Sequence, residues 1–483
     1  MEISLKKIIF VQDISNAKLM EFKKLIDRGA ELERMNEALH REDTQFIVIY
    51  GRRRIGKSEL IKRIVKARHK AIYFLSDTSS ETVQRVAFSK VAASVIDGFD
   101  KVIYPDWETL FRSFNNQLSE RMLVCLDEFP YLVKSCDVLP SIIQKLLNEK
   151  ILKFDLVLCG SSQQLMHGYV LNRQSPLYGL ANEIMKMQPI PAQYMSMAME
   201  CDAVQAVEEY AIWGGVPRYW ELRRDYPDKE TAIRKVLLDP QGPLIEEPQR
   251  LLRDDMRDMV QASTLLTIIG NGDNKLSEIA TRAGKDSNTI SEPLSKLRDL
   301  GYVSRDVPFG ESPKKSKKGI YHINDSLLRF HYQFIVPYRS ILELGRMDMV
   351  MQVVTAQLPQ FIGQCWELLC REYVSGNIID GIAYNVASRW WGKIFSPEYK
   401  DDKMVELDVV AESIDKKHIL VGECKWTHDE DADRLMNVLE QKAKYLPFIK
   451  KGQEIHLVLF LKESPTHCVK DMRVFLPSDV MKN

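Results

Sequence analysis

Short continuous runs of apolar residues alternate with longer stretches of helical periodicity through the first third of the chain. Four such runs predict strands at residues 45–50, 71–75, 122–126 and 154–159. Parallel strands covered by helices on both faces are buried on both sides, so they form continuous apolar runs instead of alternating ones. The pattern therefore predicts an α/β fold with a parallel sheet in residues 1–190.

Beyond this region the pattern changes three times, which predicts three further domains. Residues 191–255 keep a helical period and lose the strand signal, and residues 256–340 give three short helices followed by two strands. Residues 341–483 open with helices and end with alternating strands, which is typical of a small mixed α/β domain.

Residues 256–340 predict a helix-turn-helix with a wing. A short helix at residues 275–280 precedes a turn at Gly284, and residues 302–309 would pair with residues 319–323 around a lysine-rich loop. The second helix carries one apolar face, made by Ile290, Leu294, Leu297 and Leu300. Cations that could contact DNA phosphates at the wing are Lys314, Lys315, Lys317 and Lys318. The alternative is a packing module that transmits a conformational state.

The amino-acid composition excludes fewer classes of function than the pattern of hydrophobic positions does. Hydrophobic residues make up 45% and charged residues 28% of 483 residues, which is typical of a globular protein with more than one domain. Lys+Arg and Asp+Glu both total 67, so any nucleic-acid partner must be argued from local patches. The cysteines never occur as C-x-x-C, which favours reduced thiols. Since we find neither a secretion signal nor a membrane-length apolar stretch, we expect a cytoplasmic protein without membrane association.

A phosphate-binding loop follows the first predicted strand and opens a helix. Its sequence G-x-x-x-x-G-K-S consists of Gly51, Arg52, Arg53, Arg54, Ile55, Gly56, Lys57 and Ser58. The backbone of such a loop wraps phosphates beside a helix N-terminus. Lys57 would pair with the β- and γ-phosphates, and the Ser58 hydroxyl would ligate Mg²⁺. The alternative is a surface glycine turn.

Two acids and a serine follow the next strands of the same sheet. Asp127 would hold Mg²⁺ through its water shell, and Glu128 would act as the base that polarises the attacking water. Both lie at the carboxyl edge of the sheet, where the phosphate-binding loop also lies. Ser161, which follows a further strand, could sense the γ-phosphate.

A second group of charged residues occurs near the C-terminus. Residues 404–411 and 418–426 predict two strands of a hairpin. Strand periodicity and pairing would bring Asp408, Glu423 and Lys425 together. Two carboxylates can bind Mg²⁺, and a lysine beside them can orient the hydrolytic water.

Three motifs of the first domain resemble a family of prokaryotic, archaeal-type ATPases related to AAA+ and STAND switches. They are GRRRIGKS at residues 51–58, LDEFPYL at 126–132 and CGSSQQLM at 159–166. The resemblance implies a P-loop ATPase domain at 1–190, a helical lid at 191–255, a winged helix at 256–340 and a C-terminal domain of nuclease-like character at 341–483.

The same resemblance assigns roles to three other segments. Residues 26–32 look like the family's first helix, which packs near the adenine. Residues 175–179 fit its S-P-L-Y-G-R motif, but Leu180 stands where the arginine finger is expected. Residues 214–218 look like the STAND lid motif, so that Arg218 would report the nucleotide state; the alternative is a turn with a solvated arginine.

The C-terminal pattern D-x(14)-E-x-K resembles the PD-(D/E)xK nucleases, in particular the Holliday-junction resolvase branch. The resemblance implies a restriction-endonuclease-like domain with Asp408, Glu423 and the helix acid Glu367 as metal ligands. Lys425 would be the catalytic lysine, and Gln441 matches a glutamine that some branches add. The alternative is a degenerate fold with ordinary surface ion pairs.

Together these features predict a Mg²⁺-dependent switch that binds and hydrolyses ATP and is coupled to a nucleic-acid-processing, endonuclease-like domain. DNA would bind through the wing and the C-terminal domain, and nucleotide could drive homo-oligomer formation. The alternative function is a signalling or regulatory STAND-like protein whose C-terminal domain only binds a partner. A transcription regulator that uses the winged helix has less support, because the basic residues are confined to the wing.

Overall fold

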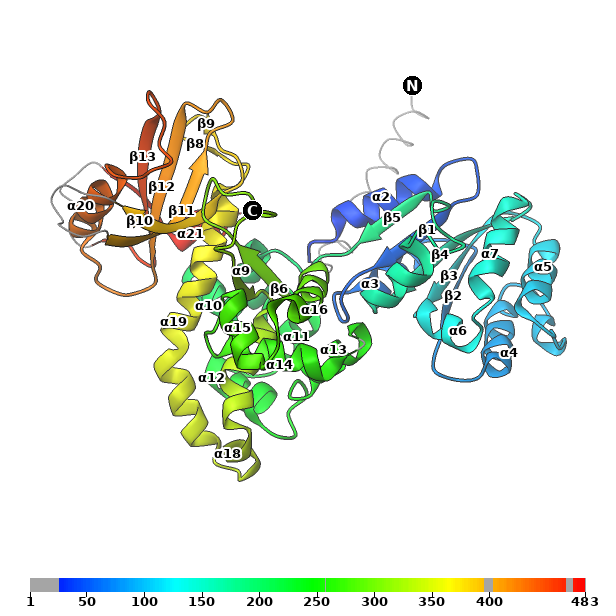
Figure 1. Ribbon diagram of the computed structural model, residues 1–483. Helices are drawn as coiled ribbons and strands as arrows, with labels where there is room; N and C mark the ends of the chain where they lie inside the picture. The colour runs from blue at the N-terminus through cyan, green and yellow to red at the C-terminus, as the bar shows by residue number, and fades with distance from the viewer. Residues whose placement is uncertain (1–25, 257, 395–402, 466–471, 483) are drawn as a thin grey trace, which may run out of the picture. The chain divides into compact units, whose positions relative to one another are not determined.

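The chain divides into two compact units (Figure 1). The computed structural model describes residues 26–256, 258–394, 403–465 and 472–482. The first unit comprises the described residues up to Ile190 together with Val216–Arg218, and the second comprises the remainder. The first unit thus ends at Ile190 apart from Val216–Arg218, and the domain boundaries expected at residues 190, 255 and 340 stay predictions.

A five-stranded parallel sheet forms the centre of the first unit. Its strands lie in the order β2-β3-β4-β1-β5. They are β1 (Phe46–Tyr50), β2 (Ala71–Leu75), β3 (Met122–Asp127), β4 (Phe154–Gly160) and β5 (Glu183–Lys186). The four apolar runs thus form the predicted parallel strands. Strand β5 was not predicted, because it is a four-residue edge strand with a charged residue at each end.

Helices cover this sheet with an aromatic-rich core on one face. Helices α4 (Glu81–Ala92), α5 (Trp107–Gln117), α6 (Phe129–Ser135) and α7 (Leu139–Asn148) contribute to this core together with the strands. Phe88 lies at its centre, with ring centroids of four neighbours between 5.5 and 6.0 Å away. Helix α2 (Gly29–Leu39) contacts α3 (Lys57–Lys66), which lies against β2 and β3.

The segment that follows is helical, as its periodicity predicted. No strand occurs in the described residues between 191 and 256. The α-helices are α9 (Met195–Met199), α10 (Ala203–Trp213), α11 (Pro217–Arg224), α12 (Lys229–Ala232) and α13 (Glu247–Asp255).

Three helices and a hairpin then share one hydrophobic core. The helices are α14 (Met259–Gly270), α15 (Leu276–Ala283) and α16 (Ser287–Asp299), and the antiparallel strands are β6 (Val303–Asp306) and β7 (Ile320–Ile323). Three of the four predicted apolar positions of α16 are fully buried in this core, and Leu300 is partly buried at its edge.

The last part of the second unit is a five-stranded mixed sheet that packs against the long helix α19 (Met347–Val374). Its strands, in spatial order, are β10 (Ser388–Ile394), β11 (Lys403–Glu412), β12 (His418–Lys425), β13 (Glu454–Leu461) and β14 (Arg473–Phe475). Strands β11 and β12 form the predicted antiparallel hairpin, and β12, β13 and β14 are parallel. Helix α20 (Ala432–Ala443) connects β12 to β13 and packs on the sheet.

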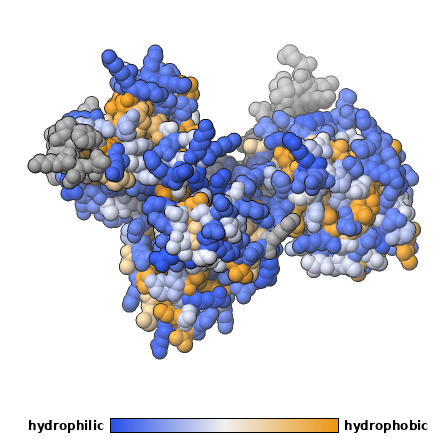
Figure 2. All heavy atoms as spheres, viewed as in Figure 1, coloured by the Kyte–Doolittle hydropathy of each residue, from blue (hydrophilic) through white to orange (hydrophobic). Residues whose placement is uncertain are grey.

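Hydrophobic residues on the face seen in Figure 2 lie in small groups among hydrophilic ones. None of the helices in the described part of the chain combines the length and the apolar character that a membrane span requires.

Candidate functional site

The phosphate-binding loop is fixed by two glycines between β1 and α3. Gly51 has a φ of +148°, and a Cβ there would lie 2.5 Å from the carbonyl oxygen of Met187 and 2.8 Å from Ile55 Cδ1. Only glycine therefore fits at this position. Gly56 caps α3 with a φ of +93°, so its requirement is conformational. The helix N-terminus at this loop offers N–H groups and a positive dipole end to an anion.

Lys57 is the first residue of α3, and its side chain reaches back across the loop. Its ammonium group donates hydrogen bonds to the carbonyl oxygens of Gly51, at 2.9 Å, and Arg52, at 2.8 Å. The side chain is buried, so its positively charged ammonium group lies inside the loop. Arg52 is also buried, whereas Arg53 and Arg54 are half-buried, and Arg54 adopts a left-handed conformation with a φ of +69°.

Ser58 and Asp127, the predicted magnesium ligands, meet at one phenol. The Tyr73 hydroxyl donates to Asp127 Oδ2 at 2.6 Å, and the Ser58 side chain lies near the same phenol. Burial raises the pKa of Tyr73, the bonded Asp127 carboxylate raises it further, and the nearby Ser58 side chain acts to lower it. Asp127 is 0% exposed, and its other oxygen accepts the N–H of Glu128 at 2.9 Å. The structure therefore brings the two residues together, as their positions at the sheet edge predicted.

Glu128 lies in the left-handed region, with a φ of +53°, directly before α6. Its carboxylate accepts hydrogen bonds from the Ser161 hydroxyl and from the Ser161 N–H at 3.3 Å. From the other side, the Ser76 hydroxyl bonds to the carbonyl oxygens of Asp127 and Glu128, at 2.6 and 2.7 Å. The ends of β2, β3 and β4 thus hold the acid in place. Ser161 lies against Glu128, and its role as a γ-phosphate sensor stays a prediction.

The segments assigned by resemblance lie in different surroundings. Arg28, from residues 26–32, donates to the carbonyl oxygens of Ile55, at 3.0 Å, and Gln188, at 2.8 Å, which ties the start of α2 to the phosphate-binding loop. Leu180 packs, partly buried, against the core of the first unit. Arg218 is exposed on α11.

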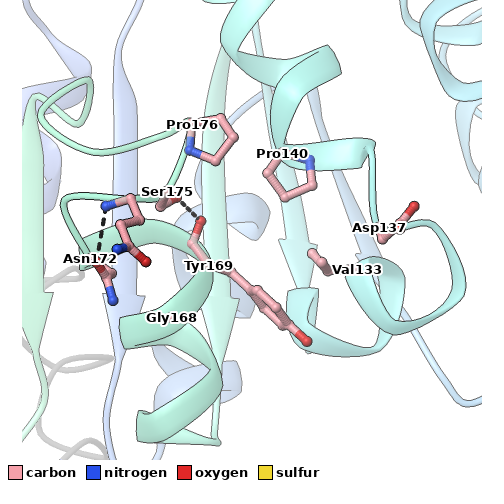
Figure 3. Close-up of a pocket in the computed structure, with 9 residues that line it drawn as sticks. Val133, Asp137, Pro140, Gly168, Tyr169, Asn172, Ser175 and Pro176 are labelled. Carbon is pink, nitrogen blue, oxygen red and sulfur yellow. Dashed lines mark hydrogen bonds between the residues drawn. The ribbon is translucent and has the colours of Figure 1, made fainter.

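Ser175 and Pro176 of the predicted S-P-L-Y-G motif line a cavity of about 250 Å³ (Figure 3). Its opposite wall is formed by Val133, Asp137 and Pro140, and the Tyr169 side chain points toward them. The Ser175 hydroxyl donates to the Tyr169 carbonyl oxygen, which closes the loop on itself. The motif is therefore a folded loop whose first residues face this cavity.

The C-terminal carboxylates converge at a bulge in β11. Between the pairs Trp390–Leu407 and Ser388–Val410, β11 has one more residue than β10. Bulges re-aim side chains next to functional sites. Here Asp408 Oδ2 accepts the backbone N–H of Cys424 at 2.8 Å, which places the acid between Glu423 and Lys425 of the neighbouring strand.

Lysines neutralise Glu423 from two elements. Lys425 and Lys442 donate to its two carboxylate oxygens, each at 2.8 Å. Burial acts to raise the pKa of Glu423, but the two lysines lower it below its usual value. The pKa of the Asp408 carboxyl changes in the opposite direction. Burial raises it most, and the charge of Glu423 raises it further.

Glu367 of α19 belongs to the same cluster. Burial, followed by the charge of Asp408, raises the pKa of Glu367 to about 7. Carboxylate oxygens are the ligands that Mg²⁺ and Mn²⁺ prefer. Among the described residues, the carboxylate oxygens of Asp408, Glu423 and Glu367 do not all come within 4.8 Å of one another, so their role as metal ligands stays a prediction.

Sequence reasoning missed the cations that surround these acids. Arg371 donates to the carbonyl oxygen of Asp408 at 3.0 Å, and Arg389 forms an ion pair with Glu406. On α20 the predicted Gln441 is exposed, and the next residue, Lys442, contacts the site instead. None of the three cations belongs to a motif, so only the packing of α19, β10 and α20 reveals them.

The four lysines of the loop between β6 and β7 are exposed, and the role of this loop as a DNA-contacting wing stays a prediction. The Arg305 guanidinium donates to the carbonyl oxygens of Pro313, at 2.6 Å, and Ser316, at 2.7 Å, which holds the loop. Lys318 pairs with Glu311 at 2.7 Å, and hydrogen bonds from Lys318 and Ser316 lower the pKa of Glu311.

Two family models match parts of the chain. Residues 25–220 match an ATPase domain predominantly from Archaea, and this range contains the whole phosphate-binding loop together with Asp127 and Glu128. Residues 331–444 match a family described as archaeal and bacterial proteins of unknown function, a range that contains Asp408, Glu423, Lys425 and Lys442.

The chain is also similar to individual proteins. An uncharacterized protein of Methanocaldococcus jannaschii is 29% identical over 431 residues, which cover 87% of this chain and 92% of the relative. The Aeropyrum pernix ORC1 protein, solved in complex with DNA, is 17% identical with a TM-score of 0.36, and 66% of this chain and 94% of that chain are covered. The Aeropyrum pernix ORC2 protein, solved as ADPNP and ADP complexes, is 12% identical with a TM-score of 0.43. The match covers 69% of this chain and 96% of that chain.

Proposed function

We propose that this chain is a Mg²⁺-dependent ATPase. The observation that carries the proposal is the meeting of Ser58 and Asp127 at Tyr73, beside Lys57 and Glu128, at the carboxyl edge of one parallel sheet. The similarity of residues 25–220 to an ATPase domain supports it.

The residues of this edge would divide the work of phosphoryl transfer. Lys57 would exchange the carbonyl oxygens of Gly51 and Arg52 for phosphate oxygens, which stabilises the charge on the transferred group. Ser58 and Asp127 would hold Mg²⁺, which neutralises phosphate charge when bound. Glu128 would accept a proton from the attacking water on a carboxylate lone pair that the two Ser161 hydrogen bonds leave available.

Three variants test the ATPase proposal. Lys57→Ala should abolish hydrolysis, whereas Lys66→Ala, an exposed lysine at the end of the same helix, should leave it unchanged. Glu128→Gln should bind a fluorescent ATP analogue as the wild type does and lose turnover. Wild-type hydrolysis by Glu128→Gln would exclude Glu128 as the base.

We further propose that the C-terminal cluster is a divalent-metal site that cleaves phosphodiester bonds in DNA, with the lysine-rich wing as an additional DNA contact. The convergence of Asp408, Glu423 and Lys425, with Glu367 beside them, supports this function. Lys425 would stabilise the developing phosphate charge or the attacking hydroxide. The regulatory alternative, a C-terminal domain that only binds a partner, is favoured by the pairing of both Glu423 oxygens with lysines, which completes the charge balance without a metal.

A cleavage assay with Mn²⁺, performed with and without ATP on branched and linear DNA, separates the two functions. Glu423→Ala should lose metal-induced thermal stabilisation and cleavage together, whereas Lys425→Ala should lose cleavage and keep most metal binding. No cleavage and no thermal shift with any metal or substrate would support the partner-binding function.

A further inference from the structure

Two histidines and a glutamate lie together at the beginning of β12 and β13, away from the acids of the proposed nuclease site. His418 is paired with Glu454 in the parallel register of these strands, and His456 lies two residues further along β13. Residues two apart on a strand share a face, so all three side chains project on the same side of the sheet. Glu423 lies five steps further along β12 than His418, which is roughly 16 Å at about 3.3 Å per residue.

The donor atoms of the three side chains converge. His418 Nδ1 lies 3.0 Å from His456 Nε2 and 3.4 Å from a carboxylate oxygen of Glu454. The same His456 nitrogen lies 3.9 Å from the other oxygen of Glu454. Nitrogen and oxygen ligands about 2.0–2.1 Å from a tetrahedral Zn²⁺ are about 3.3 Å apart. Two of the three separations lie within about 0.3 Å of this value and the third exceeds it by about 0.6 Å, so a rotation of the exposed Glu454 side chain would let the three ligands enclose one ion.

We propose that His418, Glu454 and His456 bind a divalent transition-metal ion, with Zn²⁺ as the first choice. Two imidazoles and one carboxylate are ligands that zinc prefers, whereas Mg²⁺ and Ca²⁺ prefer oxygen alone. Two facing ring nitrogens can share only one proton, and a metal ion satisfies both lone pairs at once. The site is independent of the proposed ATPase and nuclease functions.

Exposure of the three side chains indicates an exchangeable ion with an open position. His418 is 24% exposed, His456 30% and Glu454 67%, so solvent reaches the cluster. Three protein ligands leave one position of a tetrahedral ion for water or for a group of a ligand.

The backbone around His418 is held in place before any ion binds. Its N–H donates to the Ser413 hydroxyl at 3.0 Å, and that hydroxyl donates to Asp415 at 2.6 Å. These bonds fix the turn that joins β11 to β12. A bound ion would add a link between β12 and β13, and β12 is the strand that carries Glu423 and Lys425. Metal binding should therefore stabilise the C-terminal sheet against unfolding.

The test is a Zn²⁺ titration of the full chain, freed of metal by a chelator and competed with a chromophoric zinc indicator. The wild type should bind one more equivalent of Zn²⁺ than the His418→Ala/His456→Ala variant. Zn²⁺ should raise the melting temperature of the wild type more than that of the variant. Co²⁺ in place of Zn²⁺ should give the wild type a strong visible absorption that is typical of four-coordinate cobalt, and the variant should lack it.

His428→Ala is the matched control, because His428 is an exposed histidine of the same domain that faces one carboxylate, Glu463, at 3.0 Å. It should keep the additional Zn²⁺ equivalent, and so should Asp408→Asn, which affects only the proposed nuclease site. Equal Zn²⁺ binding and equal thermal shifts of the wild type and the double variant would overturn the proposal. A loss of the same equivalent in His428→Ala would also overturn it, because binding would then be general to surface histidines.

Discussion

The charge of Glu367 should oppose folding of the metal-free chain, and its removal should therefore stabilise the protein. Burial and the neighbouring Asp408 raise the pKa of Glu367 from 4.5 to about 7. The unfolded chain then releases this proton at a lower pH than the folded chain does. Stability is consequently lost as the pH rises from 4.5 to about 7. Glu367→Gln keeps the shape of the side chain and abolishes the ionisation.

The size of the effect follows from the pKa difference. At about 1.4 kcal/mol for each pKa unit, the rise corresponds to about 3 kcal/mol of stability lost above pH 7. The Glu367 side chain is 28% exposed, so solvent screens part of this charge and about 3 kcal/mol is an upper limit. Glu367→Gln should recover this amount above pH 7, and it should equal the wild type below pH 4.5, where both states carry the proton.

Urea unfolding followed by tryptophan fluorescence measures the effect, because Trp366 and Trp426 lie in this domain with ring centroids 5.2 Å apart. Glu423→Gln provides a comparison of opposite sign. Although burial acts to raise the pKa of Glu423, Lys425 and Lys442 lower it, so its ionised form stabilises the fold above its usual pKa and this stability is lost as the pH falls. A Glu367→Gln variant that is no more stable than the metal-free wild type above pH 7 would refute the reasoning. With Mn²⁺ the variant should become the less stable protein, because it has lost a ligand.

Three further predictions concern the nucleotide site and the wing. Tyr73→Phe should lower the free energy of unfolding by about 1.5–3 kcal/mol, because the buried Asp127 carboxylate loses a hydrogen-bond donor. An unchanged free energy of unfolding, measured with heat or urea, would contradict this role of the phenol. By the resemblance of residues 175–179 to S-P-L-Y-G-R, Leu180 stands where an arginine finger would supply a factor of about 10³–10⁵ in rate. Single-turnover hydrolysis should therefore be slow, and Leu180→Arg should accelerate it or leave it unchanged. Fast wild-type hydrolysis that collapses in Arg173→Ala or Arg218→Ala would show that another arginine has this role. The wing lysines are Lys314, Lys315, Lys317 and Lys318. Neutralising all four should reduce the log–log slope of DNA affinity against salt concentration by about 0.9 for each DNA phosphate that the wing no longer neutralises. An unchanged slope would make the wing a packing element.

The elements that could be predicted from the sequence are those determined by residues close together in the chain. The strands β1, β2, β3 and β4 are short apolar runs, and the phosphate-binding loop is defined by residues close together in the chain. The edge of a parallel sheet then places Asp127 near Ser58 without any knowledge of side-chain packing. The hairpin of β11 and β12 follows in the same way from two strands and a short polar link.

The parts that could not be predicted depend on contacts between distant segments. Tyr73 reaches Asp127 only because β2 pairs with β3, and nothing in the sequence of β2 marks one tyrosine for this role. Lys442 reaches Glu423 because α20 presents that position to the sheet, whereas the motif match favoured its exposed neighbour. The cluster of His418, Glu454 and His456 depends on the register of two strands that are separated by a helix.

Because of the bulge in β11, the position of the Asp408 side chain depends on the number of residues in this strand. Leu407 and Val410 both lie in the core beside α20, although two residues of strand lie between them, because the bulge absorbs one step of the alternation. A one-residue deletion between them would remove the bulge and still leave Leu407 and Val410 on one face, so the core pattern would be kept and the local re-aiming of Asp408 would be lost. Insertions and deletions should therefore be rarer in the chain's relatives at this position than in the turn after β11. A search for such sites by a fixed acid-to-acid spacing would overlook relatives that lack the extra residue.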